Sequence, residues 1–337
     1  MKNILFIANP ISGTHGKTSI FQMINERIDR DKYSWNIVNT KCQGDAVELA
    51  ADAVKRHIDM VVAIGGDGTI NEVARSLVNT DTAIGVIPCG SGNGLARHLQ
   101  IPLNVNRAID ILNEGFVDMI DYGTINDKAF FCTCGVGFDA IISLKFAAAG
   151  KRGPLTYVEQ TLREWLSYKP ETYELETEDG VKIYEAFLIA CGNASQYGNN
   201  AFITPKAKLS DGLLDVTVLK KFSVFDVPSL AFQLFNKTID HNSCIKTFQC
   251  SKLSIHRSKP GVVHFDGDPM IMDKDINIEL KRSGLKVIVS KKFNEEKQKD
   301  DSIVLQRINS FFEGIKDVNK GIMNTFSSTS KKKEGNN

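Results

Sequence analysis

The chain has 337 residues, of which 42% are hydrophobic and 24% are charged. These proportions are typical of a folded globular protein and exclude a wholly disordered chain or a fibre. Lysine and arginine number 41 and aspartate and glutamate 40, so the formal net charge is only +1. That balance excludes a surface-wide coat for nucleic acid, and any phosphate-bearing ligand has to be met by a local site. The length predicts two domains.

Residues 1–125 alternate strand-like runs with helical stretches. Strands are expected at 3–8, 34–39, 59–64 and 83–87, and helices at 17–30, 46–57, 70–77 and 107–113. A strand, a glycine-rich turn and a helix, repeated along the chain, predict a doubly wound α/β domain with a parallel sheet.

Residues 126–293 carry shorter runs, many of which alternate between apolar and polar positions. Strands are expected at 129–134, 173–177, 186–191, 214–219, 253–256, 262–265, 276–280 and 287–289, and helices near 139–147, 155–168 and 224–236. The pattern predicts an antiparallel β-sandwich domain. Its last strand is a candidate for returning to the sheet of the first domain.

Residues 294–337 form a third segment. Apolar residues recur at intervals of four, three, four, three and four, at Val304, Ile308, Phe311, Ile315, Val318 and Ile322. This spacing predicts an amphipathic helix, and the lysine-rich end that follows it is expected to be disordered. Two alternatives stay open for the helix: docking on its own core or on a partner, such as a second copy in a homodimer, or lying on an anionic membrane surface.

The cysteines and the apolar runs bear on the compartment. Seven cysteines are scattered without a C-x-x-C pair, which favours reduced thiols in apolar cores over a zinc site. The N-terminal apolar run is shorter than a signal sequence needs, and no run reaches the ~18 apolar residues of a membrane span. We therefore expect a cytoplasmic protein.

Three glycine-rich loops follow predicted strands of the first domain, where open α/β sheets bind ligands. They span 9–17, 65–73 and 88–97. Main-chain N–H groups of the first loop could hold a phosphate, with Lys17 adding a charge, although a plain structural turn is an equal alternative. The third loop has glycines at alternate positions and predicts a second wall for the triphosphate or its ribose.

Asp67 stands in the middle of the second loop, GGDGTINEV. A carboxylate beside phosphates is repulsive unless a cation separates them, so Asp67 predicts bound Mg²⁺. The alternative is that Asp67 is the N-cap of the following helix. The loop lacks both the lysine of a P-loop and the G-x-G-x-x-G spacing, which argues against a nicotinamide dehydrogenase.

GGDGTINEV and the later GSGNGLAR resemble the diacylglycerol kinase catalytic-domain family, which includes bacterial soluble lipid kinases, sphingosine kinases and ceramide kinases. NAD kinases and phosphofructokinases share GGDGT alone. The other matches are NPISG at 9–13, IDYG at 120–123, GVGFDA at 135–140, KLSDGLLDV at 208–216 and FDGDP at 265–269. They cover residues 1 to about 293 and imply an NAD-kinase/phosphofructokinase-like first domain followed by the β-sandwich.

The resemblance, together with the loops themselves, assigns the ligand-binding residues. The ATP site comprises Asn9, Ser12, Gly13, Lys17, Thr40, Gly65, Gly66, Asp67, Gly68, Thr69, Asn71, Glu72, Gly90, Ser91, Gly92 and Asn93. The resemblance further implies a Mg²⁺ held by Asp211 and the main-chain oxygens of Lys208 and Leu213. It also implies that Asp121 supports Asp67 through water.

The last motif departs from the family. The family usually has Asp-Gly-Glu, whose Glu is the proposed general base, whereas this chain has Asp266-Gly267-Asp268. Asp268 is one methylene shorter, yet it can still accept a proton, so we assign it as the base and Asp266 as structural. A lysine that the family often has before Leu-x-Tyr is replaced by Pro154, and Lys151 or Arg152 is expected to stand in.

The leading functional hypothesis is a Mg²⁺- and ATP-dependent lipid kinase that converts diacylglycerol to phosphatidic acid, bound peripherally to the membrane. A sphingoid-base or ceramide kinase shares the mechanism and is the nearest alternative. A soluble-substrate kinase such as NAD kinase is disfavoured by the matches beyond GGDGT. A catalytically weak lipid-binding protein that keeps the fold is the alternative from another class, and its only support is the replacement at Asp268.

Overall fold

The computed structural model describes residues 1–13, 17–149, 168–295 and 297. Residues 1–290 form one compact unit and 291–337 a second, and the helices and strands named below belong to the first. The predicted helix at 155–168, apart from its last residue, and the amphipathic positions of 294–337 lie outside the described residues, as do Lys151 and Arg152.

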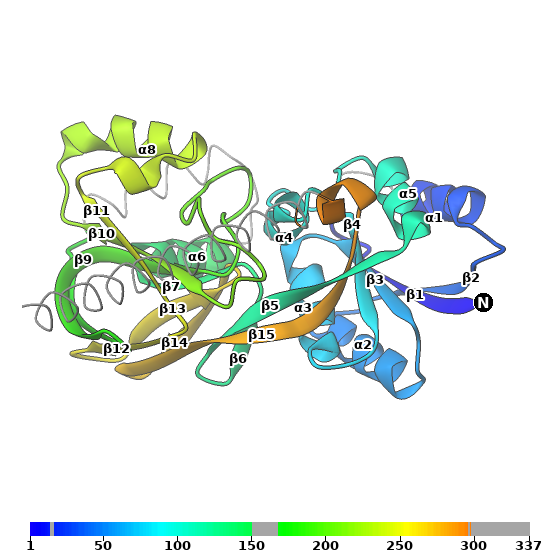
Figure 1. Cartoon of the computed structure of the whole chain (residues 1–337), viewed down its shortest axis with the longest axis horizontal. Coiled ribbons are helices and arrows are strands. Elements are labelled where there is room, and N and C mark those ends of the chain that lie inside the picture. The colour runs from blue at the N-terminus through cyan, green and yellow to red at the C-terminus, as the bar shows by residue number, and fades with distance from the viewer. Residues whose placement is uncertain (14–16, 150–167, 296, 298–337) are drawn as a thin grey trace, which may run out of the picture. The chain divides into compact units, whose positions relative to one another are not determined.

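The first half is a parallel sheet with helices on both faces (Figure 1). Its strands run in the order β4-β3-β1-β2, and each neighbouring pair is parallel. They are β1 (Lys2–Ala8), β2 (Tyr33–Asn39), β3 (Met60–Gly65) and β4 (Ala83–Pro88). Every residue of β3 and β4 is buried, as the unbroken apolar runs of a sheet covered on both faces require.

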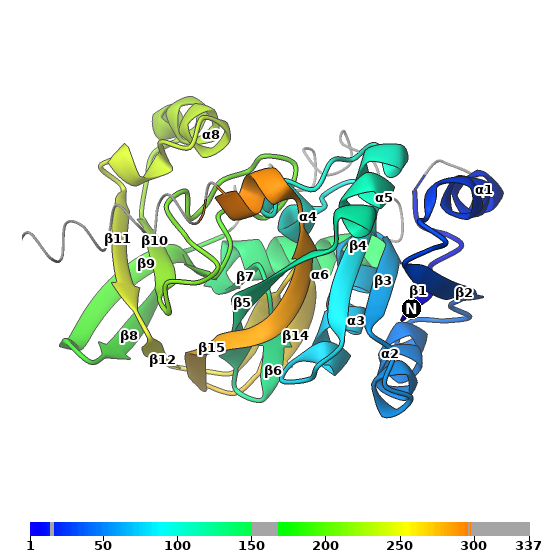
Figure 2. The same ribbon diagram turned by 45° about the vertical axis from the view of Figure 1, so that its right-hand side comes forward.

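The helices of this half pack in pairs. They are α1 (Lys17–Arg27), α2 (Asp45–Lys55), α3 (Asp67–Leu77), α4 (Gly94–His98) and α5 (Val105–Glu114). In both views α1 and α5 lie together on one face of the sheet, with α2 and α3 together on the other (Figures 1 and 2). The apolar side of α3 is buried at Ile70, Val73 and Leu77, which fixes the rotation of this helix and so the direction of its polar residues.

The second half is mainly antiparallel. The sheet continues in the order β14-β13-β7-β9-β8-β12-β15. Off this path, β10 pairs with β9 and β11 with β10, while β5 pairs with β15 and β6 with β5. The strands are β5 (Phe116–Ile125), β6 (Lys128–Phe130), β7 (Thr133–Gly137), β8 (Glu171–Thr177), β9 (Gly180–Gly192), β10 (Leu214–Lys220), β11 (Ile245–Cys250), β12 (Lys252–Arg257), β13 (Gly261–Phe265), β14 (Asp268–Met272) and β15 (Asp275–Val289). The helical elements are α6 (Phe138–Ala149), α8 (Val227–Phe235), η1 (Val224–Asp226) and η2 (Ile239–His241).

Strand β15, orange in Figure 1, joins the two halves. Its first part pairs with β12, and near its end Val287 pairs in parallel with Ile84 of β4. The pairing with β5 shifts register between Lys281 and Leu285. A Cβ at Gly284 would lie 2.2 Å from the Tyr122 ring, so glycine is needed where this strand bends.

Two apolar clusters hold the second half together. One fills the sheet interior and includes Phe130, Tyr173 and Ile255. The other, which we call the α6–α8 cluster, joins Phe138 and Ile142 of α6 to Leu230 of α8 and to Phe187, Leu188, Ala190, Ile203, Leu219, Ile239 and Ile245.

Several elements differ from the sequence expectations. Strands β5, β11 and β14 were not predicted, because polar or charged residues interrupt their apolar positions. The strands expected at 276–280 and 287–289 are one long strand, and the one expected at 129–134 is divided between β6 and β7. The helix expected at 224–236 begins as η1, and α8 has proline in its first turn.

Candidate active site

The three glycine-rich loops meet at the carboxyl ends of β1, β3 and β4. The Asn9 side-chain amide donates to Thr69 Oγ1 at 3.3 Å, which links the first loop to the second. Gly13 has φ +75°, and a Cβ there would lie 2.3 Å from the Cys89 carbonyl oxygen. The first loop therefore approaches the third through a glycine that no other residue can replace without movement.

The second and third loops touch through glycines. A Cβ at Gly90 would lie 2.5 Å from the Gly66 Cα, and a Cβ at Gly92 would lie 2.6 Å from Asp67 Oδ2. A Cβ at Gly65 would overlap the Thr69 side chain. A Cβ at Gly68, in contrast, would meet nothing within 4 Å, so Gly68 borders open space.

Asp67 is the first residue of α3, but it caps a different helix. Its Oδ2 accepts the Asn93 N–H at 2.7 Å and its Oδ1 accepts the Gly94 N–H at 2.6 Å, both at the start of α4. The N-cap of α3 is Gly66, without a side-chain cap, so the alternative of Asp67 as the cap of its own helix is wrong. Burial raises the pKa of Asp67, and the two main-chain donors oppose that shift.

Other predicted ATP-site residues mainly shape the loops. Asn93 has φ +51° and closes a turn, accepting the Gly90 N–H at 3.0 Å and donating to the Gly90 carbonyl at 2.7 Å. The Ser12 hydroxyl donates to the Asn9 carbonyl at 3.0 Å, whereas Ser91 is exposed.

The outer part of the predicted ATP site contains two further anchors. Thr40 is buried and its N–H donates to the Ala8 carbonyl at 2.9 Å. Glu72 accepts the Gly44 N–H at 3.0 Å, which ties the segment before α2 to α3. Lys17 begins α1, but its side chain lies outside the described part of the structure.

Asp266 connects α3 with the second half. Its carboxylate accepts the N–H groups of Phe131, Cys132 and Thr133 at 2.8, 2.7 and 3.0 Å. The Asn71 side-chain amide donates to the same carboxylate. Burial raises the pKa of Asp266 to about 6 in spite of these donors. The fully bonded carboxylate acts as a structural link between α3 and the strands that surround it.

Asp268, the first residue of β14, lies beside Arg75, which is one helical turn beyond Asn71 on α3. The Arg75 Nη2 is 3.6 Å from Asp268 Oδ2, and the Asp268 side chain is 50% exposed. The guanidinium also lies 5.0 Å from the centre of the Phe265 ring. Burial raises the pKa of Asp268, and the positive charge of Arg75 opposes that shift.

Arg75 was not among the predicted site residues. The available signal was spacing, because Asp67, Asn71 and Arg75 follow one another at intervals of four residues and therefore share one face of α3. The Nε and Nη2 atoms of Arg75 are buried and without a hydrogen-bond partner among the described residues. A guanidinium held in this way can orient the neighbouring carboxylate by charge.

The predicted metal loop is held by Asp121. This buried side chain accepts the Gly212 N–H at 2.8 Å and the Ser283 N–H at 2.6 Å. None of its hydrogen bonds among the described residues reaches Asp67. Within the loop, Asp211 Oδ1 accepts the Leu213 N–H at 3.0 Å. Burial, and secondarily the charge of Asp121, raise the pKa of Asp211.

The donor set of this loop suits Mg²⁺, which prefers a carboxylate with carbonyl and water oxygens. No group of three or more His, Cys, Asp or Glu side chains is placed for a metal in the described part of the chain. A site here would therefore contain fewer than three such side chains, and main-chain carbonyls or water would complete it.

The second half also closes on the third loop. Asn199 donates its N–H to the Gly92 carbonyl at 3.1 Å, and a Cβ at Gly198 would lie 2.9 Å from the Gly92 Cα. His98, at the end of α4, accepts the Ser195 N–H at its Nδ1 at 3.0 Å. Burial lowers the pKa of His98 to about 4, so this link is made by a neutral imidazole.

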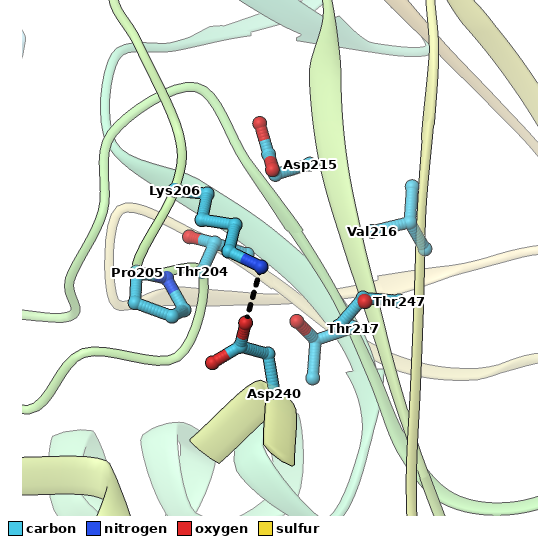
Figure 3. Close-up of a pocket in the computed structure, with 8 residues that line it drawn as sticks. All are labelled: Thr204, Pro205, Lys206, Asp215, Val216, Thr217, Asp240 and Thr247. Atoms are coloured by element: carbon cyan, nitrogen blue, oxygen red, sulfur yellow. Dashed lines mark ion pairs between the residues drawn. The ribbon is translucent and has the colours of Figure 1, made fainter. Parts of the chain in front are cut away.

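A separate polar pocket is shown in Figure 3. It is lined by Thr204, Pro205, Lys206, Asp215, Val216, Thr217, Asp240 and Thr247. Lys206 pairs with the nearly buried Asp240 at 2.7 Å. None of the predicted site residues lines this pocket, so it is distinct from the glycine-loop site.

Comparison with known proteins places these features in a family. The model of the diacylglycerol kinase catalytic domain matches residues 3–125, and that of the YegS C-terminal NAD kinase β-sandwich-like domain matches 132–288. A diacylglycerol kinase of Mycobacterium tuberculosis is 30% identical over 274 residues, which cover 78% of this chain and 87% of that protein. The chain belongs to the diacylglycerol kinase family. It is therefore a lipid kinase.

Two further relatives agree with this assignment. A diacylglycerol kinase of Bacillus subtilis is 28% identical over 276 residues, covering 80% of this chain and 90% of that protein. The crystal structure of a diacylglycerol kinase from Bacillus anthracis shares the fold with a TM-score of 0.69 at 20% identity, covering 87% of this chain and 98% of that one. These findings confirm the predicted fold class. None of the described helices has the length and apolar character needed to cross a bilayer.

Proposed function

We propose that this lipid kinase transfers the γ-phosphoryl group of ATP to the hydroxyl of diacylglycerol in a Mg²⁺-dependent reaction. The main support is the set of three close-packed glycine loops around Asp67, with Asp266 and Asp268 brought to the same helix from the second half. The relatives named diacylglycerol kinase favour this acceptor. Residues 1–125 would bind the nucleotide and residues 126–293 the lipid.

The nucleotide phosphates would lie at the start of α3. This 11-residue helix has no side-chain cap at Gly66, so the N–H groups of its first turn are available to an anion. Gly68 borders open space on that side. The three glycine-rich loops would form the walls of this phosphate site, and their close contacts depend on Gly13, Gly90 and Gly92.

Asp211 with the carbonyls of Lys208 and Leu213 would hold one Mg²⁺, and Asp67 would serve a second at the phosphates. Each Asp67 oxygen accepts one N–H and keeps a further lone pair. Bound Mg²⁺ neutralises charge on the phosphate oxygens.

Asp268 is the carboxylate best suited to act as the base. Asp266 accepts four donors and Asp67 accepts two main-chain N–H groups, whereas Asp268 is half-exposed and paired only with Arg75 among the described residues. Asp268 would take the proton of the lipid hydroxyl. The hydroxyl oxygen of the lipid would then form a bond to the γ-phosphorus, while the bond between that phosphorus and the oxygen of ADP breaks. Arg75 would act as a positioning residue that keeps Asp268 ionised and directed.

Acceptor competition tests the proposal. The full chain is supplied with Mg²⁺ and γ-labelled ATP, together with equal amounts of diacylglycerol, ceramide, sphingosine and NAD in detergent micelles. We expect the label in phosphatidic acid. Label in ceramide phosphate or sphingosine phosphate would show that the acceptor is not diacylglycerol, although the mechanism of phosphoryl transfer would stand. ATP binding without any labelled product would favour a lipid-binding protein.

A further inference from the structure

The segment around α8 exposes an unusual number of large apolar side chains. Phe225 is 89% exposed, Phe232 68% and Phe235 56%, and Val224 is also exposed. We call these four residues the α8 face. Its rings expose roughly 400 Å² in total if a phenylalanine side chain has about 200 Å². The largest apolar patch on a typical soluble monomer measures about 300–600 Å² and often has a function.

The α8 face is one side of a continuous turn and helix. Phe225, Pro228, Phe232 and Phe235 follow one another at intervals of three, four and three residues, the spacing of one helical face. In both views α8 lies at the upper edge of its half (Figures 1 and 2). Leu230, on the inner side, is buried in the α6–α8 cluster, so the helix is anchored without the outer rings.

The charges that border the α8 face are mainly positive. Lys221 and Lys237 are exposed at its two ends, and the Lys237 ammonium lies 4.4 Å from the centre of the Phe202 ring. The Asp226 carboxylate accepts the Ser223 N–H at 2.7 Å within a capping box. Asp240 is 5% exposed and is paired with Lys206. Aromatic rings flanked by lysines suit a surface of anionic lipid headgroups over an apolar interior.

The α6–α8 cluster joins Leu230 of α8 to Phe138 and Ile142 of α6. Helix α6 packs against β13 and β14, and β14 begins at Asp268. The α8 face is therefore connected to the strand that begins at the proposed base through the packing of α8, the α6–α8 cluster and α6.

We propose that the α8 face docks on the surface of an anionic bilayer, with Phe225, Phe232 and Phe235 inserted among the lipids. This inference rests on the proposed lipid kinase function. Docking itself is measured by vesicle binding, which does not depend on catalysis.

The test uses the full chain and flotation with vesicles of phosphatidylcholine, alone or with one third phosphatidylglycerol. We expect binding to the anionic vesicles that weakens with salt. The variant Phe225→Ser/Phe232→Ser should bind at least about tenfold more weakly, since the two rings can no longer be buried in the bilayer. Lys221→Glu should weaken binding to the anionic vesicles and leave binding to pure phosphatidylcholine unchanged. Ile183→Ser is the matched control, because Ile183 is 67% exposed on β9, and it should bind as the wild type does.

Activity is measured in parallel on two forms of diacylglycerol. With a short-chain, water-soluble diacylglycerol the double phenylalanine variant should match the wild type, while with vesicles its rate should fall with its binding. Absence of product from both forms in every protein would overturn the proposed function but not the docking result. Wild-type vesicle binding by the double variant would overturn the docking proposal. So would a wild-type dimer that the variant converts to monomer, because a second copy would then cover the face.

Discussion

Asp266→Asn is expected to weaken the link between α3 and the strands of the second half. Phe131 N–H and the Asn71 amide donate to one carboxylate oxygen, and Cys132 and Thr133 N–H donate to the other. An asparagine offers one acceptor oxygen, so two buried donors lose their partner whichever way the amide is turned. At about 1–3 kcal/mol for each, the free energy of unfolding should fall by at least about 2 kcal/mol at pH 4, where Asp266 is protonated and the comparison is between two neutral side chains.

The pH dependence sharpens this prediction. Burial raises the pKa of Asp266 to about 6 in the folded protein, from an ordinary value of 3.8. Folding therefore favours the protonated form of Asp266. The contribution of this protonation to the free energy of unfolding is fully present below about pH 4 and is lost as the pH rises through 6. Its size is about 3 kcal/mol. The stability difference between wild type and Asp266→Asn should thus narrow by up to that amount between pH 4 and 7.

Urea unfolding followed by circular dichroism between pH 4 and 7.5 measures this difference. Asp127→Asn, at an exposed turn position, is the matched control and should leave stability unchanged. A difference that widens as the pH rises would refute the reasoning, because the main-chain donors would then outweigh the burial of the charge.

Three further changes address the chemistry. Asp268→Asn should lower kcat about 10²–10⁴-fold and leave the unfolding midpoint unchanged, because the side chain is half-exposed; near-normal kcat would exclude it as the base. Arg75→Gln should move the acidic limb of the pH–rate profile to higher pH, since Arg75 lowers the pKa of Asp268, and an unmoved limb would deny Arg75 its positioning role. Asp211→Ala should raise the Mg²⁺ concentration needed for half-maximal activity, measured by titration, whereas an identical Mg²⁺ curve would remove the ion from that loop.

The sequence was most informative where one strand or loop determines its own structure. The unbroken apolar runs of β3 and β4 and the glycine loops that follow them predicted a parallel sheet with loops at its carboxyl edge. Strands β5 and β14 escaped prediction because acidic or exposed residues break their patterns. Their place is set by neighbours in the sheet rather than by their own residues.

The contacts between distant segments could not be predicted in the same way. Asn71 and Asp266 are 195 residues apart, and only the assembled sheet brings them together. The sequence predicts that Asp67 belongs to the site, but its capping of α4 depends on the adjacency of β3 and β4. Arg75 could not be predicted as a site residue, because its sequence position does not indicate that Asp268 lies beside it.

The most direct test of the central claim is the identity of the phosphorylated product. Purified diacylglycerol in detergent micelles is incubated with ATP, Mg²⁺ and either the wild type or Asp268→Asn, and the lipids are analysed by mass spectrometry. The proposal predicts phosphatidic acid from the wild type and a rate at least about a hundredfold lower from the variant. Absence of phosphatidic acid from the wild type, while ATP still binds, would contradict it.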